Sequence, residues 1–226
     1  MENFLLKISV MLVPALLAIT CHEVSHGYVA FRLGDNTARS MGRLTLNPLK
    51  HLDIIGTIMV FLVGIGWAKP VPVDFRNLRN PKRDMIWVAA AGPVTNFALA
   101  ALSALALRVI MHFEPAFSQF SLASMFLNPV SLMLGFSVYI NLLLCLFNLI
   151  PVPPLDGGRV VVGILPHRQA LAYSRIEPYG MMIIIVLVFF TKIFQYVLAP
   201  LLDLGIRLLA GSQSGLIYAL TGFLLR

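Results

Sequence analysis

His22-Glu23-Val24-Ser25-His26 places two imidazoles and a carboxylate within one short stretch of the chain. On an α-helix, residues i and i+4 lie on one face with their Cβ atoms about 5–6 Å apart. That separation allows two histidines to bind one zinc ion. The glutamate after the first histidine could then act as general base towards a water activated by the metal, which is the chemistry of a metalloprotease. The motif therefore predicts zinc-dependent hydrolysis of peptide bonds.

The motif lies in an apolar stretch of the sequence. Phe4–Ala18 contains one charged residue, Lys7, and apolar residues continue past the motif to Phe31. Ionisable side chains in hydrocarbon are costly and usually mark a functional site. The alternative is a chance motif whose histidines pack in a core or reach the interface. Three ionisable residues so close together disfavour that alternative.

A third metal ligand must come from elsewhere, because a catalytic zinc usually takes three protein ligands and leaves a fourth position for water. Asp156 is the strongest candidate. It lies in Pro151-Val152-Pro153-Pro154-Leu155-Asp156-Gly157-Gly158, where prolines end a helix and glycines allow the backbone to approach closely. In isolation, a turn or a helix cap would explain Asp156 equally well. With two histidines on the same side of the membrane, the ligand role is favoured.

Two asparagines near the ends of apolar runs are further candidates. Asn96 lies within one run and Asn148 closes another. An amide in lipid must find partners, so interhelical hydrogen bonding would explain both. The functional alternative is that Asn148 stabilises an oxyanion during catalysis and that Asn96 binds the substrate backbone. The residues themselves leave both alternatives open.

The composition is that of a membrane protein, with 58% hydrophobic residues, 12% charged residues and a mean hydropathy of +0.85. A helix needs about 20 mainly apolar residues to cross a bilayer. Four stretches meet that requirement, at about Phe4–Phe31, Met85–Met111, Pro129–Ile150 and Gly180–Leu198. The tail Ala199–Arg226 is either a further span or a helix at the interface.

The net charge of +7 is distributed unevenly along the chain. Basic residues cluster within residues 32–83 and 151–178, whereas residues 113–128 contain Glu114 and no Lys or Arg. The positive-inside rule therefore places the first two regions in the cytoplasm and the third outside. We interpret the charge as membrane anchoring rather than nucleic-acid binding.

Ile54–Trp67 is too short for a span, and both of its flanks are basic. These features predict a re-entrant element that enters the membrane from the cytoplasm and returns there. With the first span ending at Arg32, His26 lies roughly 9 Å inside the cytoplasmic boundary. The active site is therefore expected near the cytoplasmic side of the cell membrane.

These motifs together resemble those of the site-2 proteases, zinc metalloproteases that cleave within membranes. The resemblance is to compact prokaryotic members without an appended regulatory domain, and it covers about residues 15–165. It rests on His22-Glu23-x-x-His26, Asn47-Pro48, Gly56-Thr57, Gly66-Trp67-Ala68-Lys69-Pro70-Val71-Pro72-Val73, Gly92-Pro93-x-x-Asn96, Asn148 and Leu155-Asp156-Gly157.

The resemblance implies one zinc ion per chain, with His22, His26 and Asp156 as ligands and Glu23 as general base. It also implies a polar channel that brings water to the site. A strand-like element is implied near Met41–Leu46, and its edge could pair with an unwound substrate helix.

We therefore expect an all-α polytopic membrane protein with about four to six transmembrane helices, a re-entrant element and a short β-hairpin near the active site. One integral-membrane protease domain would cover residues 1–226, with its core at about 4–165 and C-terminal helices at about 179–226. Its partners would be the lipid bilayer and a transmembrane segment of a membrane protein substrate, with no nucleic acid. A homo-oligomer is left open. The alternative functions are a zinc transporter or sensor, and an inactive scaffold that binds transmembrane helices.

Overall fold

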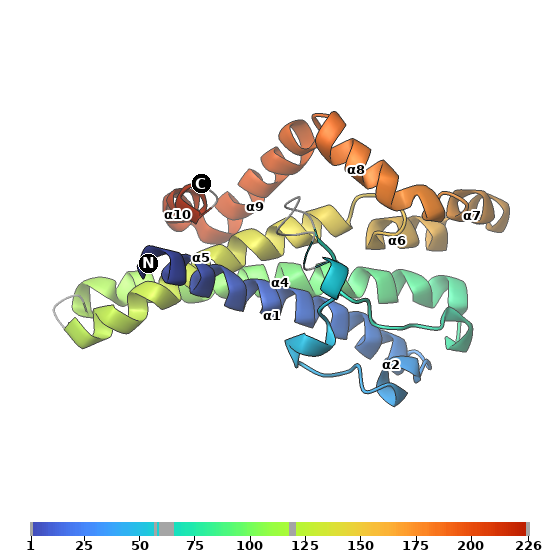
Figure 1. The fold of residues 1–226 in the computed structure, drawn as a ribbon, viewed down its shortest axis with the longest axis horizontal. Helices are drawn as coiled ribbons and strands as arrows, with labels where there is room; N and C mark the ends of the chain where they lie inside the picture. Colours follow the sequence, from blue (N-terminus) through green and yellow to red (C-terminus); the bar gives the residue numbers. More distant parts are fainter. Residues whose placement is uncertain (1, 57, 59–65, 118–120, 225–226) are drawn as a thin grey trace. The chain divides into compact units, whose positions relative to one another are not determined.

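A computed structural model describes residues 2–56, 58, 66–117 and 121–224, most of which are helical (Figure 1). The chain divides into two compact units. The first unit consists of Met1–Ala18, Asn96–Leu146 and Ile193–Arg226, and the second consists of Ile19–Thr95 and Phe147–Lys192. Three long helices contribute residues to both units, namely α1 (Glu2–Arg32), α4 (Pro81–Phe117) and α5 (Ser121–Asn148).

The start of α4 shows how local sequence sets a helix boundary. Pro81 occupies the first helical position, where a residue without an N–H costs no hydrogen bond. One turn later, the Asp84 carboxylate accepts a hydrogen bond of 2.8 Å from the Asn80 N–H. The Asp84 N–H in turn donates to the Asn80 carbonyl at 2.8 Å. These contacts fix the end of the helix that carries part of the site described below.

Five stretches of the described residues are long and apolar enough to cross a membrane, which makes this a multi-pass membrane protein. They are Lys7–Arg32, Pro81–Glu114, Met125–Asn148, His167–Phe190 and Phe194–Leu224. Their number lies within the expected four to six. The first three agree with the spans predicted from the sequence.

The fifth stretch contains the tail that the sequence left open, and it is interrupted. Its helix α9 (Ala199–Ala210) ends at Gly211, where φ is +58°. A short turn, η5 (Gly211–Gln213), then leads into α10 (Ser214–Leu224). Each of the two α-helices is about 18 Å or less in length at 1.5 Å per residue, which is shorter than the hydrocarbon core. The tail therefore does not form one straight span.

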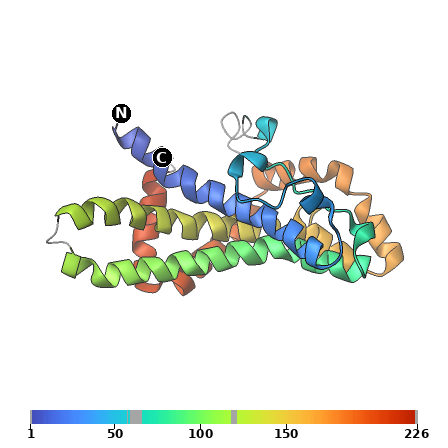
Figure 2. The same cartoon turned by 90° about the horizontal axis from the view of Figure 1, so that it is seen from below.

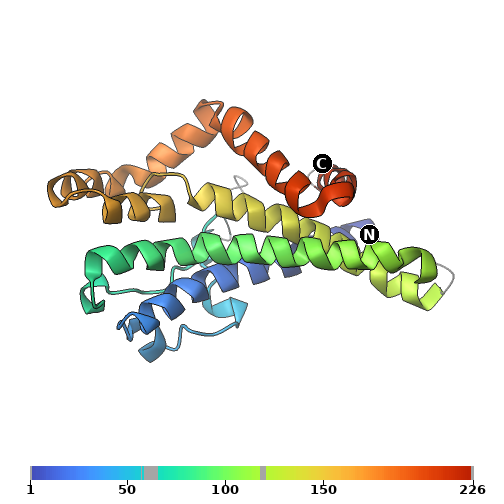
Figure 3. The same ribbon diagram turned by 180° about the vertical axis from the view of Figure 1, so that it is seen from behind.

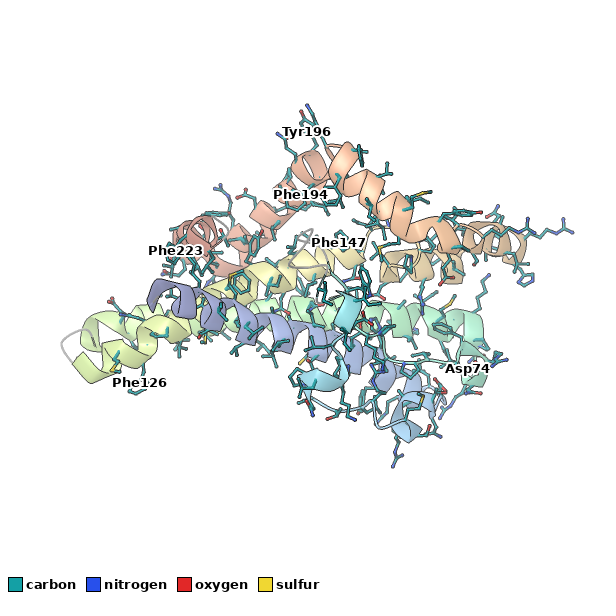
Figure 4. The ribbon with its side chains drawn as sticks, viewed as in Figure 1. Asp74, Phe126, Phe147, Phe194, Tyr196 and Phe223 are labelled. Carbon is teal, nitrogen blue, oxygen red and sulfur yellow. The ribbon has the colours of Figure 1, made fainter. Side chains whose placement is uncertain are left out.

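In the first unit, α4 and α5 run side by side (Figure 2), and the π-helical turn η4 (Phe194–Leu198) leads into α9 and then α10 (Figure 3). Its core is formed by Ala100, Ala104, Leu107, Val138, Leu142, Leu202, Ile206, Ala210 and Ile217. Large apolar side chains also point outward, among them Phe126 and Phe223, which are 67% and 47% exposed (Figure 4). An apolar exterior of this kind suits a lipid environment.

The second unit combines the end of α1 and the start of α4 with shorter elements. These are α2 (Thr37–Ser40), η1 (Pro48–Lys50), η2 (Phe75–Asn77), α6 (Asp156–Ile164), α7 (His167–Ser174), η3 (Glu177–Tyr179) and α8 (Gly180–Phe190). Ala30, Leu78 and Val88 form a small buried core between α1 and α4. Asp74, before η2, lies on the loop that leads into α4 (Figure 4).

The predicted β-hairpin near Met41–Leu46 is wrong. The described part of the chain contains no strand, and its one β-type pairing is an isolated antiparallel bridge between Leu52 and Ala68. The N–H groups of Met41, Gly42 and Arg43 donate to carbonyls of α2 at 2.9–3.1 Å. Gly42 then turns the chain with a φ of +63°. The first half of the segment therefore completes the end of α2. Its N–H groups are already used there and cannot pair with a second strand.

The expected re-entrant element at Ile54–Trp67 falls largely on residues 57 and 59–65, which lie outside the described residues, so its path stays a prediction. Its two ends are described, and they meet. Leu52 bridges Ala68, and the Lys69 N–H donates to the His51 carbonyl at 2.8 Å. A segment that starts and finishes at one place is compatible with entry and return on the same side of the membrane.

Candidate metal centre

Three side chains of the second unit converge at one point. Nε2 of His22 and Nε2 of His26 lie 3.1 Å apart. Oδ2 of Asp156 is 3.1 Å from the first nitrogen and 3.3 Å from the second. The histidines come from successive turns of α1, and Asp156 is the first residue of α6. The predicted ligand set is thus brought together, with one donor atom per residue and all three atoms within 4.8 Å of one another.

The ring of His26 is held by a contact that fixes its orientation and the hydrogen on one of its nitrogens. Its Nδ1 lies 2.7 Å from the backbone carbonyl of Val88, on α4. Because a carbonyl can accept but not donate, Nδ1 must carry the hydrogen. In the neutral imidazole, Nε2 then keeps the lone pair with which it can bind a metal. This is the usual outer-shell arrangement of a metal-binding histidine.

Gly92, also on α4, forms the wall of the site. A Cβ atom at this position would lie 2.4 Å from Cε1 of His22 and 2.5 Å from Nε2 of His26. Contacts below 3.0 Å do not occur without displacement, so a side chain here would fill the space between the two rings. The sequence pattern alone does not assign this role to Gly92. A glycine beside Pro93 in an apolar helix was the available signal, because small residues in such helices mark close packing.

The loop before Asp156 is folded tightly, as its prolines and glycines predict. A Cβ at Gly157 would lie 2.3 Å from the Leu149 carbonyl oxygen, and a Cβ at Gly158 would lie 2.3 Å from the Pro153 nitrogen. Both positions therefore require glycine. On the other side, the Tyr173 hydroxyl of α7 donates a hydrogen bond to the carbonyl of Pro151. These contacts hold the start of α6 in place.

The Asp156 carboxylate is largely buried beside the two imidazoles. Burial raises the pKa of its carboxyl group, but the neighbouring imidazoles of His22 and His26 lower it further, to about 2. Its Oδ2 atom is fully buried, and the two imidazole nitrogens are the polar atoms beside it. A buried anionic oxygen and two imidazole nitrogens that converge on one point favour a shared cation.

The donor set fits zinc. Two imidazole nitrogens and one carboxylate oxygen are the ligands of many catalytic zinc sites, which keep a fourth position for water or substrate. The side chains of His22, His26 and Asp156 are 9%, 12% and 14% exposed, so the ion would be largely shielded from solvent.

Glu23 lies beside His22 on α1, and its carboxylate is also held. Its Oε2 atom accepts a hydrogen bond of 2.9 Å from the backbone N–H of Val71. Val71 belongs to the extended segment that follows Trp67, and nothing in the sequence pattern had predicted this contact. One carboxylate oxygen is thus fixed from outside the helix.

The two asparagines have different surroundings. Asn148 is half-buried at the end of α5 in the second unit, and its predicted part in catalysis stays a prediction. Asn96 lies in the first unit and is fully buried. Its Nδ2 donates to Oδ1 of Asn141 at 2.8 Å and to the Ala18 carbonyl at 3.3 Å. These are the interhelical hydrogen bonds considered above, and they give no support to a substrate contact.

A buried site of two histidines and a carboxylate, with a glutamate beside it, in a multi-pass helical protein defines a membrane zinc metalloprotease. The chain belongs to peptidase family M50, whose family model matches residues 10–191. Membership of this family, which contains the site-2 proteases, confirms the resemblance and favours the protease over the transporter and scaffold alternatives. Zinc is accordingly its cofactor.

Similar proteins carry related names. The chain is 40% identical over 195 residues to "Putative zinc metalloprotease YwhC" of Bacillus subtilis, covering 86% of each chain. It is 29% identical over 178 residues to "Putative zinc metalloprotease Rip2" of Mycolicibacterium smegmatis, covering 76% of this chain and 63% of that one. It is 34% identical over 162 residues to "Putative zinc metalloprotease Rip3" of Mycobacterium tuberculosis, covering 71% and 31%. No solved structure gives a significant match.

Proposed function

We propose that this protease hydrolyses peptide bonds within or beside transmembrane segments of membrane protein substrates. One observation carries the proposal, namely that His22 and His26 lie inside Lys7–Arg32, a helix long and apolar enough to span the bilayer. A bond can reach this site only if the substrate approaches at membrane depth. With Arg32 at the basic end of the helix, that depth is near the cytoplasmic face of the cell membrane.

We assign the metal to His22, His26 and Asp156. When bound, zinc supplies a Lewis acid that polarises the scissile carbonyl and makes water acidic enough to attack at neutral pH.

The general base in this proposal is Glu23. Its carboxylate takes a proton from the attacking water and later gives that proton to the leaving amine. The hydrogen bond from the Val71 N–H holds Oε2 and leaves Oε1 to exchange the proton. Asn148 is the proposed donor to the developing oxyanion.

The substrate must be partly unwound before cleavage, because a helix hides its carbonyls in hydrogen bonds between residues i and i−4. Residues that weaken the helix should therefore favour cleavage. Met41–Leu46 offers the substrate no hairpin edge to pair with, because these residues form no strand.

The test uses the purified protein in detergent with zinc and three probes. The first is a tagged single-span polyleucine helix interrupted by a central Gly-Ser pair, the second is the same helix without interruption, and the third is soluble casein. We expect cleavage near the Gly-Ser pair, little cleavage of the uninterrupted helix, and none of either by Glu23→Gln with its zinc retained. Digestion of casein alone, or cleavage of the first probe by Glu23→Gln, would contradict the proposal.

A further inference from the structure

We propose that Arg43 is a positioning residue for the general base, and that it acts through the backbone of Val71. The inference rests on the proposed role of Glu23. It joins three groups of the second unit that are far apart in sequence, namely the Arg43 guanidinium, the peptide group between Pro70 and Val71, and the Glu23 carboxylate.

The sequence around Val71 leaves a single hydrogen-bond donor. Val71 stands between Pro70 and Pro72, and neither proline has a backbone N–H. A residue before proline is also restricted to extended conformations, which limits the directions its N–H can take. The one donor of this tripeptide is directed at Oε2 of Glu23, 2.9 Å away.

Arg43 holds the other side of the same peptide group. Its Nη2 atom donates to the Pro70 carbonyl at 3.3 Å and to the Lys69 carbonyl at 2.9 Å. The Pro70 carbonyl and the Val71 N–H belong to one planar unit and must rotate together. A guanidinium on the oxygen and a carboxylate on the N–H therefore fix the plane from both ends. The cation also polarises the peptide in the sense that strengthens its donation to Glu23.

The side chain of Val71 supplies a second anchor on α1. Val71 is 7% exposed. A Cβ at Gly27 would lie 2.7 Å from Cγ1 of Val71 and 2.7 Å from Cδ2 of Leu44, so both side chains occupy the notch that this glycine leaves. Gly27 directly follows His26 in the metal motif. The notch therefore seats Val71 beside the residues that hold the metal.

Packing alone does not explain why the Arg43 side chain is buried. The residue is 8% exposed, and its Nε has no hydrogen-bond partner among the described residues. None of the ion pairs found in the described part of the chain includes it. A buried guanidinium without a carboxylate is costly, and an apolar side chain would avoid that cost. The contacts it does make are the ones that orient the Val71 peptide.

The kinetic test compares Arg43→Met with Arg39→Met, a matched control because Arg39 is an exposed arginine of the same region. Initial rates on the Gly-Ser test helix give kcat and KM, and mass spectrometry gives the zinc content. We expect Arg43→Met to lower kcat about 10- to 100-fold, because small displacements of a catalytic group cost that much. KM and the zinc content should stay within about twofold of the wild type, as should all three quantities in Arg39→Met. A wild-type kcat in Arg43→Met would overturn the proposal, and so would loss of its zinc.

A second variant removes the hydrogen bond between the Val71 N–H and Glu23. Val71→Pro deletes the N–H while keeping an extended backbone, and it should lower kcat to a similar degree. Because Arg43 acts through this N–H, the double variant should be no slower than Val71→Pro alone. Additive losses would show that the two residues act independently and would overturn the proposal.

A readout without catalysis separates this inference from the proposed function. In zinc-free protein, hydrogen exchange across residues 70–72 reports the Val71 amide alone, because both neighbours are prolines. We expect this amide to exchange at least about tenfold faster in Arg43→Met than in wild type or Arg39→Met. An unchanged exchange rate would show that Arg43 does not order the Val71 peptide and would overturn the proposal. If wild type cleaves no test helix, the proposed function fails, whereas the exchange result still decides whether Arg43 orders Val71.

Discussion

Oδ2 of Asp156 lies 3.1 Å from Nε2 of His22, although one residue begins α6 and the other lies within α1. The pair exists only when the loop after α5 is folded against the first helix. Zinc binding is therefore linked to the folding of the second unit, since the donors are not assembled in an unfolded chain. Any ion held here stabilises the contact between α1 and α6 by mass action.

Asp156→Asn should lose most of its zinc affinity. The change replaces an anionic ligand by a neutral amide and should cost more than the roughly 10- to 100-fold that loss of an outer-shell partner costs. Metal content after gel filtration, and competition with a chromophoric chelator, measure the effect. Glu177→Gln is the matched control, because this carboxylate is 51% exposed and pairs with Arg159. Undiminished zinc in Asp156→Asn would move the third ligand elsewhere.

Gly92→Ala should also abolish zinc binding, although alanine is the better helix former. The added methyl group would lie 2.4 Å from the His22 ring and 2.5 Å from the His26 ring, so the rings must move apart. Gly222→Ala is the control, because a Cβ there meets nothing within 4 Å. Circular dichroism should show both variants to be helical, while zinc content should fall in Gly92→Ala alone. Equal zinc content in the two variants would show that the site does not depend on the absence of a side chain at position 92.

Asn96→Ala tests the substrate role predicted for this residue against its interhelical hydrogen bonds. Removing the amide leaves Oδ1 of Asn141 without its donor at 2.8 Å, and a buried group without a partner costs about 1–3 kcal/mol. We expect a lower melting temperature in detergent, with zinc content and KM for the Gly-Ser test helix unchanged. A higher KM in a variant of normal stability would instead restore the substrate role.

The sequence predicts the metal centre best where its residues are close together in the chain. His22 and His26 are one helical turn apart, so their spacing already indicates a shared face. Asp156 follows from the chemistry of its loop, combined with the need of a catalytic zinc for a third protein ligand. Gly92 and Val88 complete the site from α4, but which residue of one helix faces another depends on packing that no local pattern contains.

The failure at Met41–Leu46 has a comparable cause. The strand that the resemblance implies near Met41–Leu46 would need a partner strand to accept its backbone hydrogen bonds. Here the preceding helix takes the N–H groups of Met41, Gly42 and Arg43. In the second half, the Thr45 carbonyl lies 2.8 Å from Nε2 of His51, a side chain rather than a strand. These backbone groups therefore have hydrogen-bond partners without forming a sheet.

Asp35 should make stability depend on pH at the acidic end. This carboxylate is fully buried and accepts hydrogen bonds from the Asn77 amide at 2.9 Å and from the Asp74 N–H at 2.9 Å, besides the N–H and hydroxyl of Thr37. Burial raises its pKa, but the hydrogen bonds from Asn77, Thr37 and Asp74 outweigh that effect and lower it. A carboxyl whose pKa is lower in the folded state stabilises the fold above its unfolded pKa of about 3.9 and loses that contribution as the pH falls through the folded pKa.

Asp35→Asn removes this titration. It also replaces one of the two accepting oxygens by an N–H₂ group, which then faces donors that it cannot accept from. At pH 7 the variant should therefore be less stable by about 1–3 kcal/mol, the cost of an unpaired buried group. Thermal melting of both proteins in detergent between pH 7 and pH 3 measures the difference. The gap between them should be constant down to about pH 4 and should narrow below it, because only the wild type loses the contribution of this carboxylate. A gap that widens on acidification would mean that the pKa of Asp35 is raised in the folded protein, and the assigned hydrogen bonds would then be wrong.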